Sequence, residues 1–319
     1  MMKLSHKHTA LLVLALLIAI TPFFFPSSYY FRVGSLIFVN GIAVTGIVIL
    51  TGYAGQISLG HAGFAGIGAY TCALAPVHWG LHPAFAVVVG AGISAILAYL
   101  VGRPILRLKG YYLGVASLGF GILVSMVLAN ERAITGGPDG IQVPDLGLRE
   151  VLKGWGLNLN NSEFWYAFSG FALMIGAWLA LNLFNSPTGR ALRALHGSEI
   201  AARTVGVDVA RMKLQAFVIS AVYASVSGSL LALQNKFVTP DVAGFMHSIE
   251  MVTMAVLGGV GSVLGAIFGA AILTMLPQVL TVFAEYEMLL MGLVMMLVMI
   301  FLRDGLLPSL LRLVRGKDQ

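Results

Sequence analysis

Charged side chains are scarce in this chain. Only 10% of its 319 residues are Asp, Glu, Lys or Arg, against about 25% in an average soluble domain. Hydrophobic residues make up 58% of the sequence, and the mean hydropathy is +0.91. A soluble fold has too little interior to hide so much apolar surface, whereas apolar runs of about 20 residues match the thickness of a bilayer core. The composition therefore predicts an all-α polytopic membrane protein.

Cysteine is almost absent, because Cys72 is the only one. One cysteine can form neither a disulfide nor a cysteine-based metal site within one chain, and we expect no metal. The net charge of +6 would point to nucleic acid in a soluble protein. In a membrane protein Lys and Arg collect in cytosolic loops, so we expect no nucleic-acid partner.

The interiors of the apolar spans contain no Asp, Glu, Lys or Arg. Proton- and ion-coupled transporters usually carry such side chains within the bundle, which disfavours a self-contained secondary carrier. The sequence also contains no G-x-x-x-x-G-K-[ST] phosphate loop and no catalytic constellation, which argues against an ATPase and against a membrane enzyme. If this protein moves a solute uphill, the energy comes from another chain, and we expect no cofactor here.

Ten hydrophobic segments can be placed. With the N-terminus inside, fourteen of the 19 Lys and Arg residues fall on the inner side, as cytosolic loops require. The first segment lacks a small-x-small cleavage site and is interpreted as a retained span. These features predict a single transmembrane domain over residues 1–319, with ten crossings and both termini cytosolic. For residues 247–282, one long span or a span with a re-entrant piece remains an alternative to two spans. The segments lie near 9–25, 33–51, 56–76, 83–101, 111–130, 164–184, 213–234, 247–261, 262–282 and 286–302.

The longest outer loop runs over residues 131–163 and contains a turn cluster at 136–140. Loops of this length rarely lack structure in a compact domain. It could be a docking surface for an extracytoplasmic partner or a plain surface loop, and its residues alone favour neither.

The segment from Thr51 to Ala73, TGYAGQISLGHAGFAGIGAYTCA, is rich in small residues. Small residues let helices approach closely in lipid, and the polar residues near its start indicate an irregular backbone. A tightly packed central helix is the simpler interpretation, and lining a translocation path is compatible with it. A histidine within a span is a functional candidate, or it bonds a neighbour. The candidates for path or packing are Gln56, Ser58, Gly60, His61 and Gly63.

A second glycine-rich stretch, GGVGSVLGAIFGAA, begins at Gly258. Gly258, Gly259 and Gly261 suggest a broken helix, and Gly261, Gly265 and Gly269 form a doubled GxxxG ridge that predicts a close helix crossing. One such stretch in each half of the chain hints at an internal repeat whose interface holds the pathway. We take Gly258, Gly261 and Gly265 as candidates for path or packing.

Residues 186–213, SPTGRALRALHGSEIAARTVGVDVARMK, are the longest polar interruption on the predicted inner side. Ser186 followed by proline is typical of a helix start, and Gly197 could close that helix in the left-handed conformation. Ser198 could cap a second helix, which Gly206 would end. The pattern predicts two short helices outside the membrane, at about 187–196 and 199–205.

This loop also carries the charges that a partner could grip. Arg190, Arg193 and Arg203 are either such contacts or ordinary positive-inside charges that meet lipid head groups. Glu199 stands at the positive end of the second helix, where a carboxylate is favoured. Two capped helices are more rigid than a topology signal needs, so we favour a surface that contacts a partner.

Three stretches now carry a resemblance. The loop GRALRALHGSEIAARTVGVDVARMKLQAFVISA resembles the ATPase-coupling loop of ABC-importer membrane subunits, with Glu199, Ala201, Ala202 and Gly206 standing as a loose EAA–Gly motif. TGYAGQISLGHAGFAGIGAY and VLGGVGSVLGAIFGA resemble the two glycine-rich stretches of the branched-chain amino acid permease family, in its LivM-like branch. The likeness covers residues 37–277. Ile200 departs from the general EAA pattern but is similar to the form that this family has.

The resemblance implies a type II importer-like fold of about ten helices in the bacterial inner membrane. It implies a second homologous permease subunit, two cytosolic ABC ATPases that hydrolyse the ATP, and an extracytoplasmic solute-binding protein, besides membrane lipid. The substrate would be leucine, isoleucine or valine; urea, short-chain amides, another amino acid or a sugar suit the same architecture. The ATPase-coupling residues that it implies are Arg190, Arg193, Glu199, Ala202 and Gly206.

Overall fold

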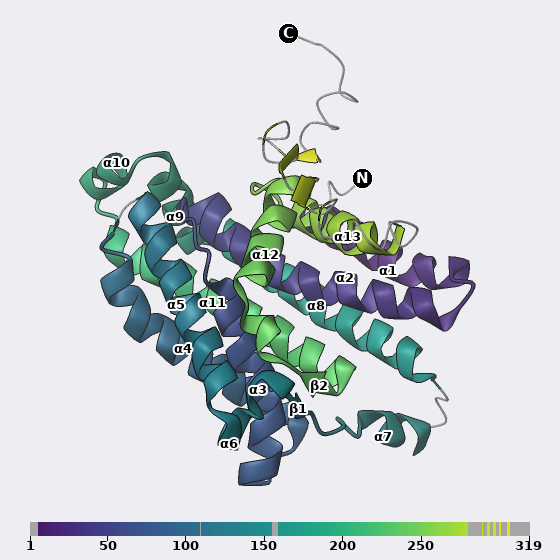
Figure 1. Cartoon of the computed structure of the whole chain (residues 1–319). Coiled ribbons are helices and arrows are strands. Elements are labelled where there is room, and N and C mark those ends of the chain that lie inside the picture. The colour runs from purple at the N-terminus through teal and green to yellow at the C-terminus, as the bar shows by residue number, and fades with distance from the viewer. Residues whose placement is uncertain are drawn as a thin grey trace.

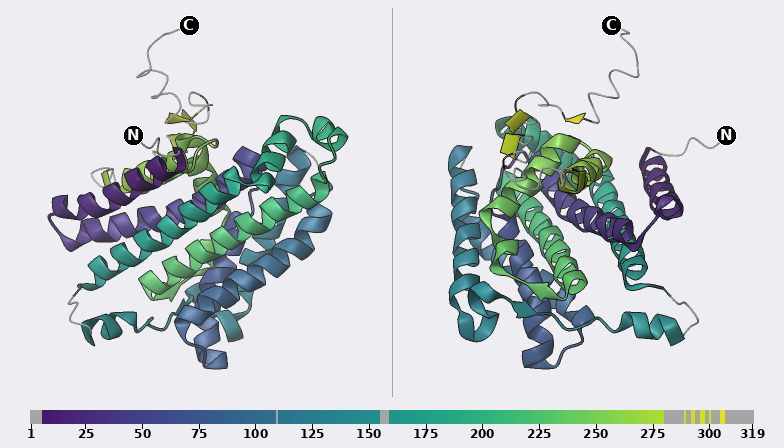
Figure 2. Two further views of the ribbon diagram at one scale, coloured as in Figure 1. Left: turned by 180° about the vertical axis from the view of Figure 1, so that it is seen from behind. Right: turned by 45° about the vertical axis from the view of Figure 1, so that its right-hand side comes forward.

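The computed structural model is a bundle of long helices (Figure 1), described for residues 6–108, 110–154, 159–279, 289, 292–293, 296–297, 300 and 305–306. Seen from behind, the long helices run alongside one another (Figure 2). The helices over these residues are α1 (His6–Ile20), α2 (Ser28–Ile47), α3 (His61–Trp79), α4 (Pro83–Ile105), α5 (Tyr111–Asn130), α6 (Arg132–Thr135), α7 (Leu148–Gly154), α8 (Asn161–Asn185), α9 (Pro187–Gly197), α10 (Glu199–Thr204), α11 (Val209–Asn235), α12 (Phe245–Gly258) and α13 (Val263–Val279).

Nine of the ten predicted segments coincide with helices, and the tenth, 286–302, lies largely outside the described residues. Among the described residues, five helices are long and apolar enough to cross a membrane: α4, α5, α8, α11 and α2 with the π-helical turn that extends it to Tyr53. The prediction of an all-α polytopic membrane protein is confirmed. The helix ends differ from the predicted ones by a few residues, and α11, for example, begins at Val209. The Asp208 side chain caps it by accepting a hydrogen bond from the Arg211 N–H, at 3.1 Å.

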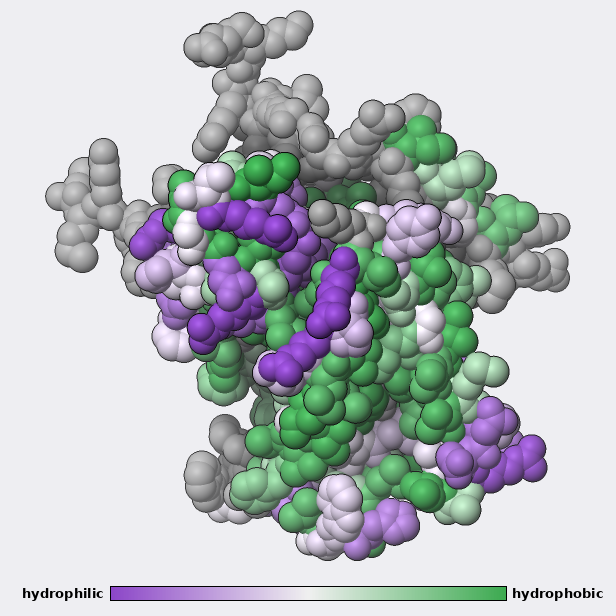
Figure 3. All heavy atoms as spheres, turned by 90° about the vertical axis from the view of Figure 1, so that its left-hand side faces the viewer, coloured by the Kyte–Doolittle hydropathy of each residue, from purple (hydrophilic) through white to green (hydrophobic). Residues whose placement is uncertain are grey.

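The polar loops gather at the two ends of the bundle. α9 and α10 lie at one end, whereas α6 and α7 lie at the other (Figure 1). On the face in Figure 3, hydrophilic side chains gather mainly towards these ends, with a hydrophobic band between them. The band is what contact with lipid tails requires.

A two-stranded sheet joins two loops that the charge pattern assigned to the same, outer side. β1 (Ile141–Gln142) pairs antiparallel with β2 (Phe237–Val238). The Lys236 ammonium donates to the Asp145 carboxylate at 2.5 Å, and this hydrogen bond lowers the pKa of Asp145. The pKa of Asp145 in the folded protein is therefore lower than that of a free carboxyl group. At a pH above the free value the ion pair stabilises the loop, and this stabilisation is lost as the pH falls through the lowered pKa of Asp145. The outer loop is therefore structured.

α3 is the central helix of the bundle, and glycine makes its packing against α11 possible. A Cβ atom on Gly68 would overlap the carbonyl oxygen of Ser225, and one on Gly228 would overlap that of Ala65. The two backbones are in direct contact, as small residues allow. The interpretation of the Thr51–Ala73 segment as a tightly packed central helix is confirmed for the part that forms α3.

The second glycine-rich stretch is a helix hairpin. Gly259, with a φ of 100°, ends α12. Gly265 of α13 meets the backbone of Gly258, and Gly269 meets that of Met254, so the two helices cross antiparallel. The broken helix is confirmed, but the place of Gly261 in the packing ridge is wrong. It lies in the turn before α13, with open space where its Cβ would stand, because the ridge can start only where the helix does.

Candidate functional site

The predicted short helices form a hairpin, α9–α10, which we call the coupling hairpin (residues 187–204). The Ser186 hydroxyl accepts a hydrogen bond from the Gly189 N–H and the Ser198 hydroxyl accepts one from the Ala201 N–H, each at 3.2 Å. Both predicted N-caps are confirmed, and Gly206, with a φ of 85°, follows the end of α10 as predicted. The cap at Gly197 was wrong. This glycine ends α9 without a positive φ, because extended backbone at Ser198, with a φ of −163°, already breaks the helix.

The coupling hairpin is seated on the membrane domain by apolar side chains. Leu192, Leu195 and Ala202 are buried in one cluster with Leu50 and Phe217 of the spans. Burying a leucine side chain contributes about 1.5–3 kcal/mol, so a hairpin with two of them resists separation from the spans. The hairpin and the spans that it contacts therefore form one packed unit.

An ion pair fastens the hairpin to α11. The ammonium of Lys213 donates to the carboxylate of Glu199. Only 8% of the Lys213 side chain is exposed, against 35% for Glu199, and a buried ammonium without a partner is costly. Sequence reasoning found Glu199 but missed Lys213, because nothing in the loop's pattern links residues fourteen apart.

The outer surface of the hairpin mixes basic and apolar side chains. Arg190 and Arg193 are exposed, as the sequence predicted. Ile200 is 79% exposed and Val205, just after α10, is 75% exposed. Two large apolar side chains, open to water on a polar loop, are typical of a protein interface. The sequence alone could have indicated these two residues. Both are apolar, and neither lies on the face of α10 that Ala202 buries against the spans.

Below the hairpin, the backbone between α2 and α3 is not α-helical, and we call residues 48–60 the helix break. A π-helical turn, Val48–Tyr53, leads into a non-helical segment that ends at His61. A Cβ on Gly55, whose φ is 64°, would lie 3.1 Å from the His196 ring of α9. A Cβ on Gly52 would overlap the Val260 carbonyl in the α12–α13 turn. The break thus touches both the hairpin and the second glycine-rich stretch.

Aromatic and basic side chains add to this contact. The ring of Tyr53 stacks on Phe184 at the end of α8, with 3.6 Å between centroids. The guanidinium of Arg193 lies over the same tyrosine ring, 5.9 Å from its centroid, within the range of a cation–π interaction. Arg193 therefore has a partner inside the chain as well as an exposed surface.

His61 is satisfied within the chain. Its Nδ1 lies 3.0 Å from the Ser58 hydroxyl, and its Nε2 lies 2.6 Å from that of Ser220 on α11. Only 1% of the residue is exposed. The histidine joins the helix break to α11, which supports the interpretation that it bonds a neighbour; Ser220 was not foreseen.

The other candidates of the first glycine-rich segment are also buried. Gly60 packs on the Ser117 carbonyl of α5, and a Cβ on Gly63 would lie 3.2 Å from the Gly121 Cα. Ser58 is buried, and so is Gln56, whose amide nitrogen and oxygen have no hydrogen-bond partner among the described residues. The five candidates of this segment are therefore all buried within the chain.

Comparison with known proteins identifies the family of this chain. A family model for the permease component of branched-chain amino acid transport systems matches residues 29–299. The chain belongs to this permease family. It is 35% identical to the high-affinity branched-chain amino acid transport system permease protein LivM of Escherichia coli K12, over 95% of this chain and 75% of LivM. The corresponding LivH protein of Salmonella typhimurium is 27% identical, over 82% of this chain and 89% of LivH.

A fructose import permease, FrcC of Rhizobium meliloti, is 28% identical over 61% of this chain and 54% of FrcC. No solved structure matches the chain. The protein is thus a permease component of a transport system and a multi-pass inner-membrane protein. The resemblance seen in its sequence motifs is confirmed at the level of the family.

Proposed function

We propose that this permease forms half of the channel of an ATP-driven importer for branched-chain amino acids. Its partners would be a second, homologous permease subunit, two cytosolic ABC ATPases and an extracytoplasmic solute-binding protein. The family and its LivM and LivH relatives support the transport role. The observation that carries the proposal is the contact of a capped, exposed hairpin with the helix break at Gly55.

The proposed motion begins at the exposed face of the hairpin. An ATPase that closes on Arg190, Ile200 and their neighbours would move the hairpin. The apolar side of the hairpin is packed on the spans, so the spans would move with it. The Glu199–Lys213 pair passes the motion to α11, and the His196–Gly55 contact passes it to the helix break. If the membrane domain has two conformations, a force on the hairpin at the inner end shifts the equilibrium between them. That shift changes access to the solute path at the outer end.

The chain itself would bind no ATP and catalyse no reaction. ATP would be hydrolysed by the partner subunits, since this sequence has no phosphate loop. The proposed path lies between this chain and the second permease subunit, because the glycine-rich helices are packed within their own subunit. The proposed path or packing residues are Gln56, Ser58, Gly60, His61, Gly63, Gly258 and Gly265.

The solute is a separate part of the proposal. LivM and LivH are named for branched-chain amino acids, whereas FrcC is named for fructose. The greater identity to LivM and the match over nearly the whole chain favour leucine, isoleucine or valine. A sugar or a small amide is the second candidate, and competition experiments distinguish them.

The test of the proposal is a pair of matched substitutions. Ile200→Glu places a carboxylate on the exposed face of α10, where the chain itself needs no apolar side chain, so we expect unchanged membrane insertion. Co-purification of the ATPase and uptake of labelled leucine should each fall at least about tenfold, the factor that 1.4 kcal/mol produces. Ile134→Glu makes the same change at an exposed isoleucine of α6, at the other end, and should retain the ATPase.

Wild-type ATPase recovery with Ile200→Glu would remove the coupling role of the hairpin. Uptake that is competed by valine and isoleucine, and not by fructose or urea, is expected of the favoured substrate class. Competition only by a sugar or an amide would retain the importer and replace its solute.

The ten crossings, with both termini cytosolic, remain part of the proposal and have their own test. Cys72 is fully buried, so single cysteines can be introduced at exposed sites without removing it. In intact cells or spheroplasts, a membrane-impermeant maleimide should label Lys153→Cys in the outer loop and leave Ser198→Cys in the hairpin unlabelled. Opening the membrane should expose Ser198→Cys. Labelling of both in sealed cells would contradict the proposed sidedness.

A further inference from the structure

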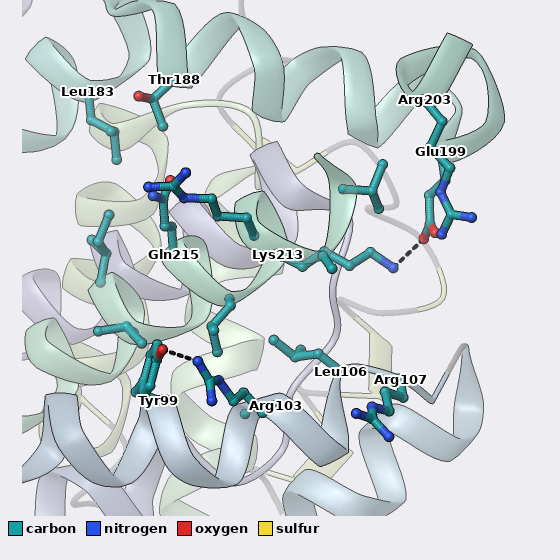
Figure 4. A pocket seen from close by; sticks show the side chains of 17 residues that line it. Tyr99, Arg103, Leu106, Arg107, Leu183, Thr188, Glu199, Arg203, Lys213 and Gln215 are labelled. Atoms are coloured by element: carbon teal, nitrogen blue, oxygen red, sulfur yellow. Dashed lines mark hydrogen bonds and ion pairs between the residues drawn. The ribbon is translucent and has the colours of Figure 1, made fainter. Parts of the chain in front are cut away.

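A cleft lies beside the coupling hairpin, where the spans meet the polar end of the bundle. Its volume is about 1260 Å³, more than the roughly 300–1,000 Å³ of pockets that take drug-sized ligands. In Figure 4, Tyr99 and Arg103 of α4, with Arg107 just beyond its end, line one side, Thr188, Glu199 and Arg203 of the hairpin line the other, and α11 passes between them. The cleft has room for more than a small ion.

The polar part of the cleft carries an excess of positive charge. Arg103, Arg107, Arg203, Arg211 and Lys213 line it, and Glu199 is its one acidic residue. Glu199 is already paired with Lys213. Among the residues that the structure describes, the four guanidiniums form no ion pair. Arginine presents a planar fork of donors that suits phosphate oxygens, so the cleft is suited to a phosphate-bearing anion.

The remainder of the cleft is apolar. Leu106 directly follows α4, Leu183 belongs to α8, and Leu214, Val218 and Ile219 belong to α11. These side chains continue the hydrophobic surface of the spans up to the arginines. A free phosphate would make no use of such a wall, whereas a molecule with a charged head and hydrocarbon chains would contact both parts.

α4 places this cleft at the level of the lipid head groups. Its outer face is exposed and apolar directly before the cleft, with Ile96 62% and Leu100 57% exposed. Tyr99 lies between these two residues on the same helix, and the Arg103 guanidinium lies 4.3 Å from its ring centroid. A tyrosine followed by an arginine, at the end of a lipid-facing helix, is typical of the membrane–water interface.

We propose that the cleft binds an anionic phospholipid of the inner leaflet, with its phosphate held by Arg103 and Arg107 and its chains along Leu106 and Leu214. Basic pockets between spans on the cytosolic side take such head groups. The ATPase is the less suitable occupant, because the exposed apolar pair Ile200 and Val205 does not line the cleft. The inference rests on the proposed orientation, with the hairpin on the cytosolic side, and does not depend on which solute is transported.

The test uses the full-length permease, purified with its partner subunits in a neutral detergent. We expect phosphatidylglycerol to raise its melting temperature and to remain bound in native mass spectra, whereas phosphatidylcholine and inorganic phosphate should do neither. Arg103→Gln/Arg107→Gln should weaken phosphatidylglycerol binding at least about tenfold. Arg190→Gln removes one charge from the same polar end but outside the cleft, and should retain the lipid.

Several results would overturn the proposal. Equal stabilisation by phosphatidylcholine would mean that head-group charge is irrelevant, and saturation by inorganic phosphate would replace the lipid by a free anion. Unchanged phosphatidylglycerol binding in Arg103→Gln/Arg107→Gln would place the lipid elsewhere. Loss of the ATPase from that variant, with the lipid retained, would assign the cleft to the ATPase. A failure of leucine transport alone would leave the lipid site standing.

Discussion

Glu199→Lys is expected to abolish uptake while the protein still reaches the membrane. The substitution leaves the largely buried Lys213 ammonium without its carboxylate and sets a second ammonium against it. Removing one partner of a fully buried pair costs about 3–5 kcal/mol, and the cost here is smaller because 35% of the Glu199 side chain is exposed to solvent. Labelled-leucine uptake in cells, with permease and ATPase quantified in the membrane fraction, measures the effect.

The double variant Glu199→Lys/Lys213→Glu tests the pair itself. It restores opposite charges across the α10–α11 contact, so part of the lost uptake should return, and Lys213→Glu alone should resemble Glu199→Lys. Asp145→Lys is the matched control, because it breaks the exposed outer pair with Lys236, and such pairs contribute about 0–1 kcal/mol. It should leave ATPase recovery unchanged. Full uptake in either single variant would falsify the link between α10 and α11. A double variant that regains none of the uptake lost in the single variants would also contradict it.

Gly228→Ala is expected to prevent the bundle from closing. The added Cβ would overlap the backbone carbonyl of Ala65, where no side chain can move aside. Overpacking a close-packed core costs about 1–3 kcal/mol, and a clash with backbone belongs at the upper end. We expect little monodisperse protein on fluorescence-detected size-exclusion chromatography, and a lower melting temperature for what remains.

Gly92→Ala is the matched control for this substitution. It adds the same methyl group within α4, at a glycine with open space around its Cβ position. Alanine favours a helix over glycine by up to about 1 kcal/mol, so the yield and melting temperature should be unchanged or higher. Equal behaviour of the two variants would show that the α3–α11 backbone contact does not limit the fold.

What could be predicted from the sequence was largely local. Ser186 and Ser198 cap helices through atoms three residues away, so their roles follow from short motifs. The spans follow from hydropathy, because a bilayer requires helices of known length. Gly197 and Gly261 were misjudged for a related reason: a glycine permits a left-handed turn or a close contact, and neighbouring residues decide whether it is used.

The contacts that join distant segments could not be predicted. Ser220 meets His61 across 159 positions, and Gly55 meets His196 across 141. Each requires the relative placement of several helices, which hydropathy does not specify. The candidate site therefore emerged only in part: its exposed charges were visible, whereas the side chains that fasten it to the spans were not.

α11 joins the two polar ends of the molecule. Its 27 residues make a rod of about 40 Å at 1.5 Å per residue, with Lys213 near one end and Lys236 just beyond the other. A coupling between two sites acts equally in both directions. If the ATPase moves this rod from the inside, then a receptor that docks on the outer loop must alter the affinity of the hairpin for the ATPase. α11 would then couple the two sites in both directions, so that docking of a solute-loaded receptor changes how the ATPase binds.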